Sequence, residues 1–204
     1  MHTRVGSRKM ISSVKIIEEK RGMPKLIVPH ANERQKKIFK KFNITLLDSI
    51  SEKDFEQEVS NYLGSHNVLH LATCRGSEPR STPLEYFNNR LIVYIFSEGG
   101  GKFANLKENG NVCYSIADPY EPGENYFGAV GLQVWGIAST FKKNEDPKRC
   151  EEIKRYSRIG DALKKQGLDQ FASTVNYNVI TIEPLKIRYL NLMKGFRNVL
   201  WEKG

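Results

Sequence analysis

One segment near the start of the chain carries the apolar repeat of a helix. From residue 51 onward, apolar side chains recur at helical spacing, at Phe55, Val59, Tyr62 and Leu63. This spacing puts them on one helix face, which predicts packing against a core. Ser51 is a suitable N-cap with Asp54 three residues later, and Gly64 is expected to end the helix.

Beyond residue 67 the pattern changes to the two-residue alternation of β-strands. The predicted strands are 68–73, 80–87, 91–96, 112–117, 130–141, 175–182 and 187–192. Turns at Gly76-Ser77 and Asn88-Asn89 separate the first three, and strands joined by such short turns must be antiparallel. Short helices are expected at 102–108, 147–156 and 161–166. The sequence therefore predicts a mainly β fold with peripheral helices, a barrel of about six to seven antiparallel strands.

The net charge of +9 is concentrated at one end of the chain. Residues 1–42 contain twelve Lys and Arg against three Glu, whereas residues 43–204 contain equal numbers of basic and acidic side chains. We therefore divide the chain into a basic N-terminal arm, 1–42, and one neutral domain, 43–204. Nucleic acid is an unlikely partner except through the arm, because no aromatic residue lies among the arm's charges before Phe39.

Composition otherwise describes an ordinary globular protein of a reducing compartment. The three cysteines have no close pairing, and the four histidines show no spacing with them that would bind a metal. No apolar run approaches the roughly 20 residues of a membrane-spanning helix, and no signal peptide is recognisable. These features predict a cytoplasmic protein without a metal site or a membrane partner.

The clearest chemical motif is the glycine-rich stretch that follows the strand at 91–96. It reads Ser97-Glu-Gly-Gly-Gly101-Lys102 and leads into a short helix. Glycines let backbone N–H groups approach a ligand, a helix start leaves N–H donors unpaired, and Lys102 adds a full charge. With the hydroxyl of Ser97, this arrangement predicts a phosphate-binding loop; an exposed lysine in a plain hairpin loop is the alternative.

Two other phosphate-binding motifs fit this stretch less well. A Walker A loop does not fit, because Phe96 stands at its first glycine and Phe103 replaces its Ser or Thr. A dinucleotide-binding fingerprint fits better, with Gly99, Gly101 and Ala104 after a strand and Asp118 further on. The connection to the next strand is nevertheless too short for the full crossover helix of a parallel sheet, so this fold ranks second.

Four further segments are informative in their order and spacing: Val68 to Thr73, Pro79 to Leu84, Tyr94 to Leu106, and Gln133 to Ala138. Together they resemble the pyridoxamine 5′-phosphate oxidase-like flavin proteins. The resemblance implies a split β-barrel that binds flavin mononucleotide (FMN) between the subunits of a homodimer. The residues it assigns to the cofactor are Arg80, Ser81, Thr82, Pro83, Ser97, Gly101, Lys102, Gln133 and Trp135.

The chemistry of these residues agrees with such roles. Arg80 offers a planar, permanently charged fork for phosphate, and Ser81 and Thr82 offer short donors. Pro83 suits a strand edge or a ligand-facing position, and Trp135 could form the wall of a site or pack in the core.

The resemblance does not extend to the residues with which pyridoxamine 5′-phosphate oxidases themselves bind their substrate. Their C-terminal segment holds the substrate with Trp, Arg and His, whereas no histidine follows His70 here, and Glu85 stands near the place of their substrate-contacting lysine. We therefore expect a flavin-dependent oxidoreductase that acts on an unidentified small molecule, without vitamin B6 phosphate oxidase activity and with no catalytic residue identified. The alternatives are a non-enzymatic flavin-binding or sensor protein, and the same fold with haem or a deazaflavin.

Overall fold

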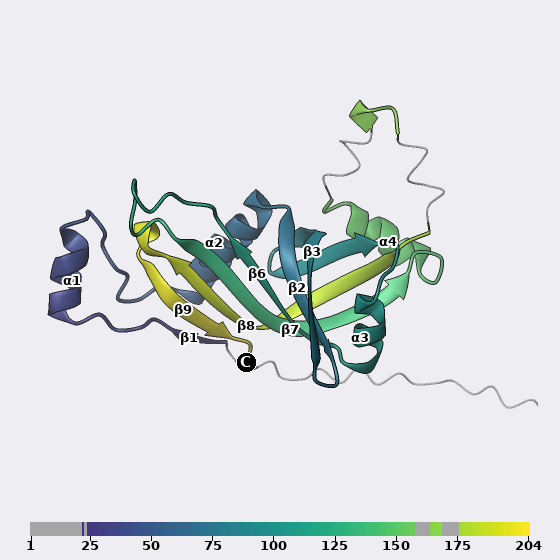
Figure 1. The fold of residues 1–204 in the computed structure, drawn as a ribbon, viewed down its shortest axis with the longest axis horizontal. Helices are drawn as coiled ribbons and strands as arrows, with labels where there is room; N and C mark the ends of the chain where they lie inside the picture. The colour runs from purple at the N-terminus through teal and green to yellow at the C-terminus, as the bar shows by residue number, and fades with distance from the viewer. Residues whose placement is uncertain (1–21, 23, 158–163, 169–175) are drawn as a thin grey trace, which may run out of the picture.

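The computed structural model describes residues 22, 24–157, 164–168 and 176–204 (Figure 1). Half of the helical piece expected at 161–166, residues 161–163, lies outside these residues. The strands are β1 (Lys25–Ile27), β2 (Val68–Arg75), β3 (Glu78–Glu85), β4 (Phe87–Asn89), β5 (Ile92–Ser97), β6 (Asn111–Ala117), β7 (Val130–Lys142), β8 (Asn178–Asn191) and β9 (Phe196–Glu202). The helices are α1 (Glu33–Lys40), α2 (Glu52–Ser65), α3 (Lys102–Glu108), α4 (Pro147–Lys154) and the single 3₁₀ turn η1 (Leu192–Lys194).

All strand pairs are antiparallel, and together they form one open, strongly bent sheet. The main order is β1-β9-β8-β7-β6-β2-β3, while β5 pairs with β8 and β4 pairs with β5. The long strand β8 divides the sheet, because its first half pairs with β5 and its second half with β9. Strand β3 ends the main order as an edge, so the barrel is split rather than closed. The predicted fold class, mainly β with peripheral helices in a split barrel, is confirmed.

Three local features differ from the sequence prediction. The two strands expected at 175–182 and 187–192 are one strand, β8, which continues through Pro184. Pro184 lies opposite Gly136, where the β7–β8 register shifts, and a Cβ on Gly136 would collide with the carbonyl oxygen of Glu183. The bulge thus absorbs the proline without ending the strand. Strand β9 was not predicted, and Asn88-Asn89 belongs to β4 while Arg90 makes the turn with a φ of 52°.

The main core lies between α2 and one face of the sheet, which we call the inner face. The four buried residues of α2 are those of the predicted stripe: Phe55, Val59, Tyr62 and Leu63. The N-cap is confirmed as well, since the hydroxyl of Ser51 accepts a hydrogen bond from the backbone of Asp54 at 3.1 Å. Leu71 of β2, Tyr114 of β6 and Val134 of β7 lie in one cross-strand row of the inner face and are almost completely buried.

Two smaller apolar clusters fix the ends of the molecule. Helix α4 packs Cys150 and Ile153 against Tyr94 of β5 and Val179 of β8. At the other end, Phe39 and Phe42 contact Phe127 in the loop between β6 and β7, with ring centroids 5.2 and 4.9 Å apart. Of the basic arm, the described residues 24–42 contain α1 and strand β1, which pairs with β9. None of the helices in the described part of the chain is long and apolar enough to cross a bilayer.

Candidate functional site

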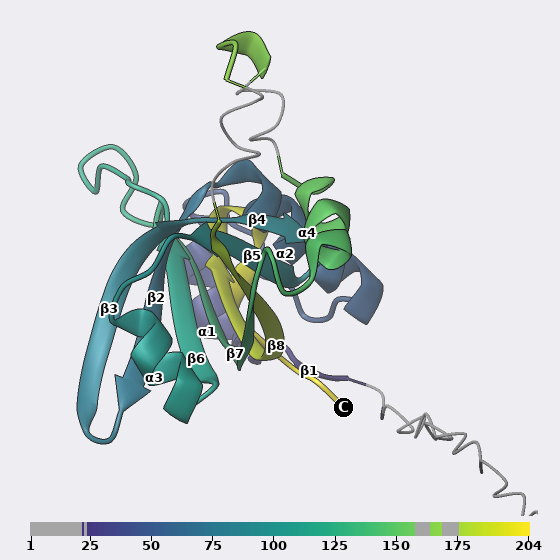
Figure 2. The ribbon, with the colours of Figure 1, turned by 90° about the vertical axis from the view of Figure 1, so that its right-hand side faces the viewer.

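Two cations converge beside the glycine-rich loop. The side chain of Arg80 projects from β3 near the open end of the barrel, where Figure 2 shows α3 beside the β2–β3 hairpin. Its guanidinium lies against Gly101: a Cβ there would be 2.8 Å from Nη1 of Arg80. Lys102 starts α3 and is only 6% exposed, with Nζ donating to the carbonyl oxygen of Gly99 at 2.6 Å. The absence of a side chain at Gly101 therefore lets the guanidinium approach the loop that holds Lys102.

The charges of Arg80 and Lys102 are not neutralised inside the described chain. Among the described residues, neither cation has a carboxylate within ion-pair distance. Burial, and secondarily the nearby charge of Arg80, lowers the pKa of Lys102 from its usual 10.5. A cation held in partial burial beside another cation favours an anionic ligand, which would relieve both effects. We call Arg80, Ser97, Gly101 and Lys102 the cradle.

The surrounding elements hold the cradle in place. Ser97 ends β5, and its hydroxyl donates to the carbonyl oxygen of Gly99 at 3.3 Å. Asn105 of α3 donates to the hydroxyl of Thr73 at 3.0 Å in a buried hydrogen bond. Thr73 is the cross-strand partner of Arg80, so this bond ties α3 to the strand pair that carries the arginine. Because α3 has only seven residues, side chains rather than the helix dipole supply the positive charge.

The dinucleotide-binding alternative is excluded by the sheet topology. Strand β5 before the glycine-rich loop pairs with β4 and β8, whereas β6 after it pairs with β2 and β7. The two strands are not parallel neighbours, and α3 is too short to be the crossover helix of a βαβ unit.

The other candidate residues divide between the two faces of the sheet. Thr82 follows Arg80 on the inner face, in the buried row with Leu71. Ser81 and Pro83 point to the opposite face, which we call the outer face, because side chains alternate along a strand. Cross-strand pairing through β2 and β6 puts Ser81 in one outer row with Trp135, and Pro83 in the next row with Gln133.

The structure thus does not bring all nine candidate residues together within one chain. Arg80, Ser97, Gly101 and Lys102 form the cradle at the open end of the barrel, with Thr82 beyond Arg80 on the same face. Gln133 and Trp135 lie on β7, three strands away from β3 and on the outer face. At about 4.8 Å per strand this separation is about 14 Å, before the thickness of the sheet is added.

Sequence reasoning missed the basic residues that accompany Trp135. Arg188 and Lys186 of β8 lie over its ring, with their charged groups 5.7 and 5.6 Å from the ring centroid. Lys186 also pairs with Glu202 at 3.3 Å, while Arg188 is exposed. Only the β7–β8 register reveals this neighbourhood, because Arg188 is opposite Gln133 and Lys186 is opposite Trp135.

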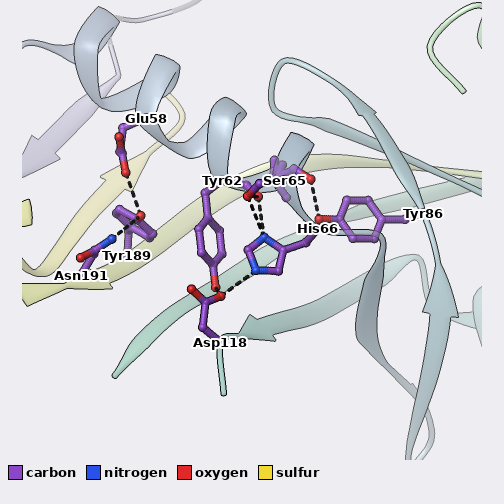
Figure 3. A network of polar contacts seen from close by, with 9 residues as sticks. Glu58, Tyr62, Ser65, His66, Tyr86, Asp118, Tyr189 and Asn191 are labelled. Carbon is purple, nitrogen blue, oxygen red and sulfur yellow. Dashed lines mark hydrogen bonds and ion pairs between the residues drawn. The ribbon is translucent and has the colours of Figure 1, made fainter. Parts of the chain in front are cut away.

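A polar network at the end of α2 was also missed. Figure 3 shows Asp118, at the start of the β6–β7 loop, between Tyr62 and His66. Its Oδ1 accepts from the Tyr62 hydroxyl at 2.8 Å and lies 2.6 Å from Nε2 of His66, while Nδ1 of His66 lies 2.8 Å from the carbonyl oxygen of Tyr62. Since both ring nitrogens face acceptors, the ring links the loop to α2 and keeps no nitrogen for a ligand. No group of three His, Cys, Asp or Glu within the described residues is placed to hold a metal.

Solved structures with the same fold belong to several kinds of protein. A Clostridium acetobutylicum protein related to general stress protein 26 matches with a TM-score of 0.51 and 13% identity, over 74% of this chain and 96% of that one. Campylobacter jejuni ChuZ matches with a TM-score of 0.51 and 20% identity, over 74% and 60%. A haem-binding protein from Mycobacterium smegmatis matches with a TM-score of 0.51 and 11% identity, over 76% and 59%. At these identities the likeness shows the fold alone.

Sequence comparison identifies the family. Comparison with curated protein sequences gave no match. The family described as pyridoxamine 5′-phosphate oxidase matches residues 55–191, which run from the core face of α2 to the end of β8 and include the cradle, Gln133 and Trp135. Because this match spans well over half of the chain, the protein belongs to the pyridoxamine 5′-phosphate oxidase family.

Proposed function

We propose that the protein binds FMN and uses it for hydride or electron transfer to or from a small molecule. The observation that carries the proposal is the convergence of Arg80 and Lys102 without an acidic partner among the described residues. A phosphate monoester is nearly dianionic at neutral pH, so it matches two adjacent cations better than a carboxylate does. Membership of the family makes a flavin phosphate the natural ligand of this chemistry.

In this proposal, each residue of the cradle has a distinct task. Arg80 provides a planar fork for two phosphate oxygens, and Lys102 provides a point charge on the same group. The hydroxyl of Ser97 can turn from the carbonyl oxygen of Gly99 to donate to the ligand. Gly101 leaves the loop backbone open to approach by both the guanidinium and the phosphate.

We further propose that the site is shared between two copies of the chain. One ligand cannot contact the cradle and Trp135 of the same chain if they lie on opposite faces about 14 Å apart. A homodimer would bring the outer face of one protomer to the cradle of the other. The exposure of β3 supports this arrangement, because its first four residues, 78–81, are exposed on both faces although they belong to a sheet.

Only one face of β7 is available to a second copy of the chain. Leu132 and Val134 are almost fully buried in the chain's own core. Trp135 is half-buried and Ile137 is 41% exposed on the outer face. These two side chains and the neighbouring Arg188 therefore form the surface that we propose for the second copy.

When bound, the flavin supplies the redox chemistry, and the chain supplies position and charge. The cradle fixes the phosphate end. Trp135 can pack against the flavin ring system, and Gln133 can form a hydrogen bond with the polar edge of that ring system. Positive charge from Arg188 would favour the electron-rich reduced ring. We assign no general acid or base.

Haem is the second candidate, because the name of the Mycobacterium smegmatis neighbour states that it binds haem. The cradle argues against it, since two cations suit a phosphate and provide no axial ligand for iron. The absorbance spectrum of the purified protein separates the two: bands near 370 and 450 nm from flavin, or an intense band near 400 nm from haem.

The direct test of the proposal is a fluorescence titration with FMN and, in parallel, with riboflavin. We expect FMN to bind and riboflavin to bind much more weakly, because only FMN has the phosphate. Equal affinity for the two would remove the role of the cradle.

A further inference from the structure

A cavity of about 360 Å³ lies beside the C-terminal end of α2. It is bounded by the end of α2, by the segment from Glu85 through β4, by Phe96 of β5, and by Tyr156 and Ser157 after α4. None of the cradle residues, and neither Gln133 nor Trp135, lines it. Its volume is at the lower end of the range of small-molecule sites.

Aromatic rings form much of the wall. Phe87 and Phe96 meet edge to face with centroids 4.9 Å apart. Tyr156 stacks on Tyr94 at 5.9 Å with an interplanar angle of 6°, and it remains 45% exposed. Tyr86 adds a ring whose hydroxyl is already engaged, because it donates to the carbonyl oxygen of Leu63 at 2.8 Å (Figure 3).

The polar groups that remain for a ligand among the described residues are the side-chain amides of Asn67 and Asn88 and the carboxylate of Glu85. His66 lines the cavity, but both of its nitrogens face acceptors of the protein. The amide nitrogen of Asn88 contacts the carbonyl oxygens of Ser60 and Arg90, which leaves its Oδ1 without a donor among the described residues. The carboxylate of Glu85 likewise has no hydrogen-bond or ion-pair partner in the described part of the chain, and the lining residues that the structure describes include no Lys or Arg.

From these features we infer that the cavity binds a small organic cation, a protonated amine attached to an aromatic body. Aromatic faces attract cations through their quadrupole, and a carboxylate at the rim completes the recognition of an ammonium group. An anionic ligand would meet Glu85 and no Lys or Arg among the described lining residues. The volume suits a molecule of about a dozen non-hydrogen atoms, the size of an aromatic monoamine.

This site shares no residue with the proposed flavin site. The cradle presents two cations to an anion, whereas the cavity presents a carboxylate and aromatic faces to a cation. Both are tied to β3, with Arg80 near one end and Glu85 at the other, about 17 Å apart along the strand. FMN binding and amine binding can therefore fail separately.

The test compares two indoles of nearly equal size and opposite charge by isothermal titration calorimetry. Tryptamine carries an ammonium group, and indole-3-propionate carries a carboxylate on a side chain of similar length. The variants are Glu85→Gln, which removes the charge, and Tyr156→Leu, which removes an exposed ring. Glu78→Gln is the matched control, since it makes the same change on an exposed residue of the same strand outside the cavity.

We expect one tryptamine per chain, no measurable binding of indole-3-propionate, and retention of tryptamine binding with saturating FMN. Glu85→Gln should weaken tryptamine about fivefold, the range of a solvent-accessible ion pair, and Tyr156→Leu should weaken it by a similar factor. Glu78→Gln should leave it unchanged. Equal binding of the two indoles, wild-type affinity in Glu85→Gln, or displacement of tryptamine by FMN would overturn the inference.

Discussion

The lysine that starts α3 offers the sharpest test of the cradle. Lys102→Met replaces a nearly buried ammonium group by an apolar side chain of similar length. Lys102 makes one hydrogen bond, to the carbonyl oxygen of Gly99, and has no carboxylate partner within the described chain. The substitution should therefore leave the fold intact and remove one of the two cations that face the ligand.

The magnitude follows from a charge-assisted hydrogen bond, which contributes about 1.5–3 kcal/mol. Lys102→Met should thus weaken FMN binding by about 10- to 150-fold. Riboflavin, which has no phosphate, should bind the variant and the wild type alike. Without ligand, the variant should melt no lower than the wild type, because burial beside Arg80 disfavours the lysine charge.

The assay is flavin fluorescence titration, with differential scanning fluorimetry of the ligand-free proteins. Lys107→Met is the matched control, since Lys107 is an exposed lysine five residues later in the same helix, and it should change neither measurement. Wild-type FMN affinity in Lys102→Met, or an equal loss for FMN and riboflavin, would refute the phosphate role.

Three further predictions follow from the same structure. Burial and Arg80 lower the pKa of free Lys102 below 10.5, and a bound phosphate would raise it again. FMN affinity should therefore fall as the pH rises through that lowered pKa. Calorimetry should find this pH dependence in the wild type and not in Lys102→Met. Gly136→Ala should lower the free energy of unfolding by about 1–3 kcal/mol in urea titrations, since its Cβ would collide with Glu183. The control Gly99→Ala, which has open space around it, should not change this free energy. Equal stability of the two variants would contradict the bulge geometry. Deletion of residues 1–21 should preserve both thermal stability and FMN binding. Deletion through Phe42 should lower the melting temperature, because it removes β1 and α1. An unchanged melting temperature of this shorter chain would show that these two elements are dispensable.

The sequence predicted the elements whose pattern is local. The stripe of α2 and its Ser51 cap are found as expected, because helical spacing and capping depend on neighbours within a few residues. Strand β9 was missed although it forms a hairpin with β8, because a register shift and the left-handed Asn198, with a φ of 53°, interrupt its two-residue alternation. Arg90 was missed as a turn residue because its left-handed conformation is imposed by the β4–β5 pairing.

The candidate site likewise contains residues that a local sequence pattern predicts and residues that only the folded structure reveals. The glycine-rich loop and Lys102 could be recognised locally, and so could Arg80 in its alternating strand. The face on which each side chain lies required the register of four strands, and it separates Arg80 from Trp135. Arg188 beside Trp135 and the Asp118 contact with His66 had no local signal, because each joins segments more than 50 residues apart.

The proposed dimer also has its own variant test. Ile137→Glu places a charge on the outer face, and the exposed Ile38 of α1 offers a matched control, Ile38→Glu. Light scattering should give a monomer for the first and a dimer of about 47 kDa for the second at micromolar concentration, by the common twofold rule. A dimeric Ile137→Glu would contradict the assigned interface.

The most direct test of a shared flavin site is complementation between two variants. Arg80→Gln removes the cradle's guanidinium, and Trp135→Ala removes the outer-face ring, so each homodimer should bind FMN weakly. Equal co-expression should form hybrid dimers in which one site has both Arg80 and Trp135 intact. We predict tight FMN binding at about a quarter of all sites, because half of the dimers are hybrids and each has one intact site. Binding no tighter than that of the separate variants would contradict the account, since it would place both residues in a site formed by one chain.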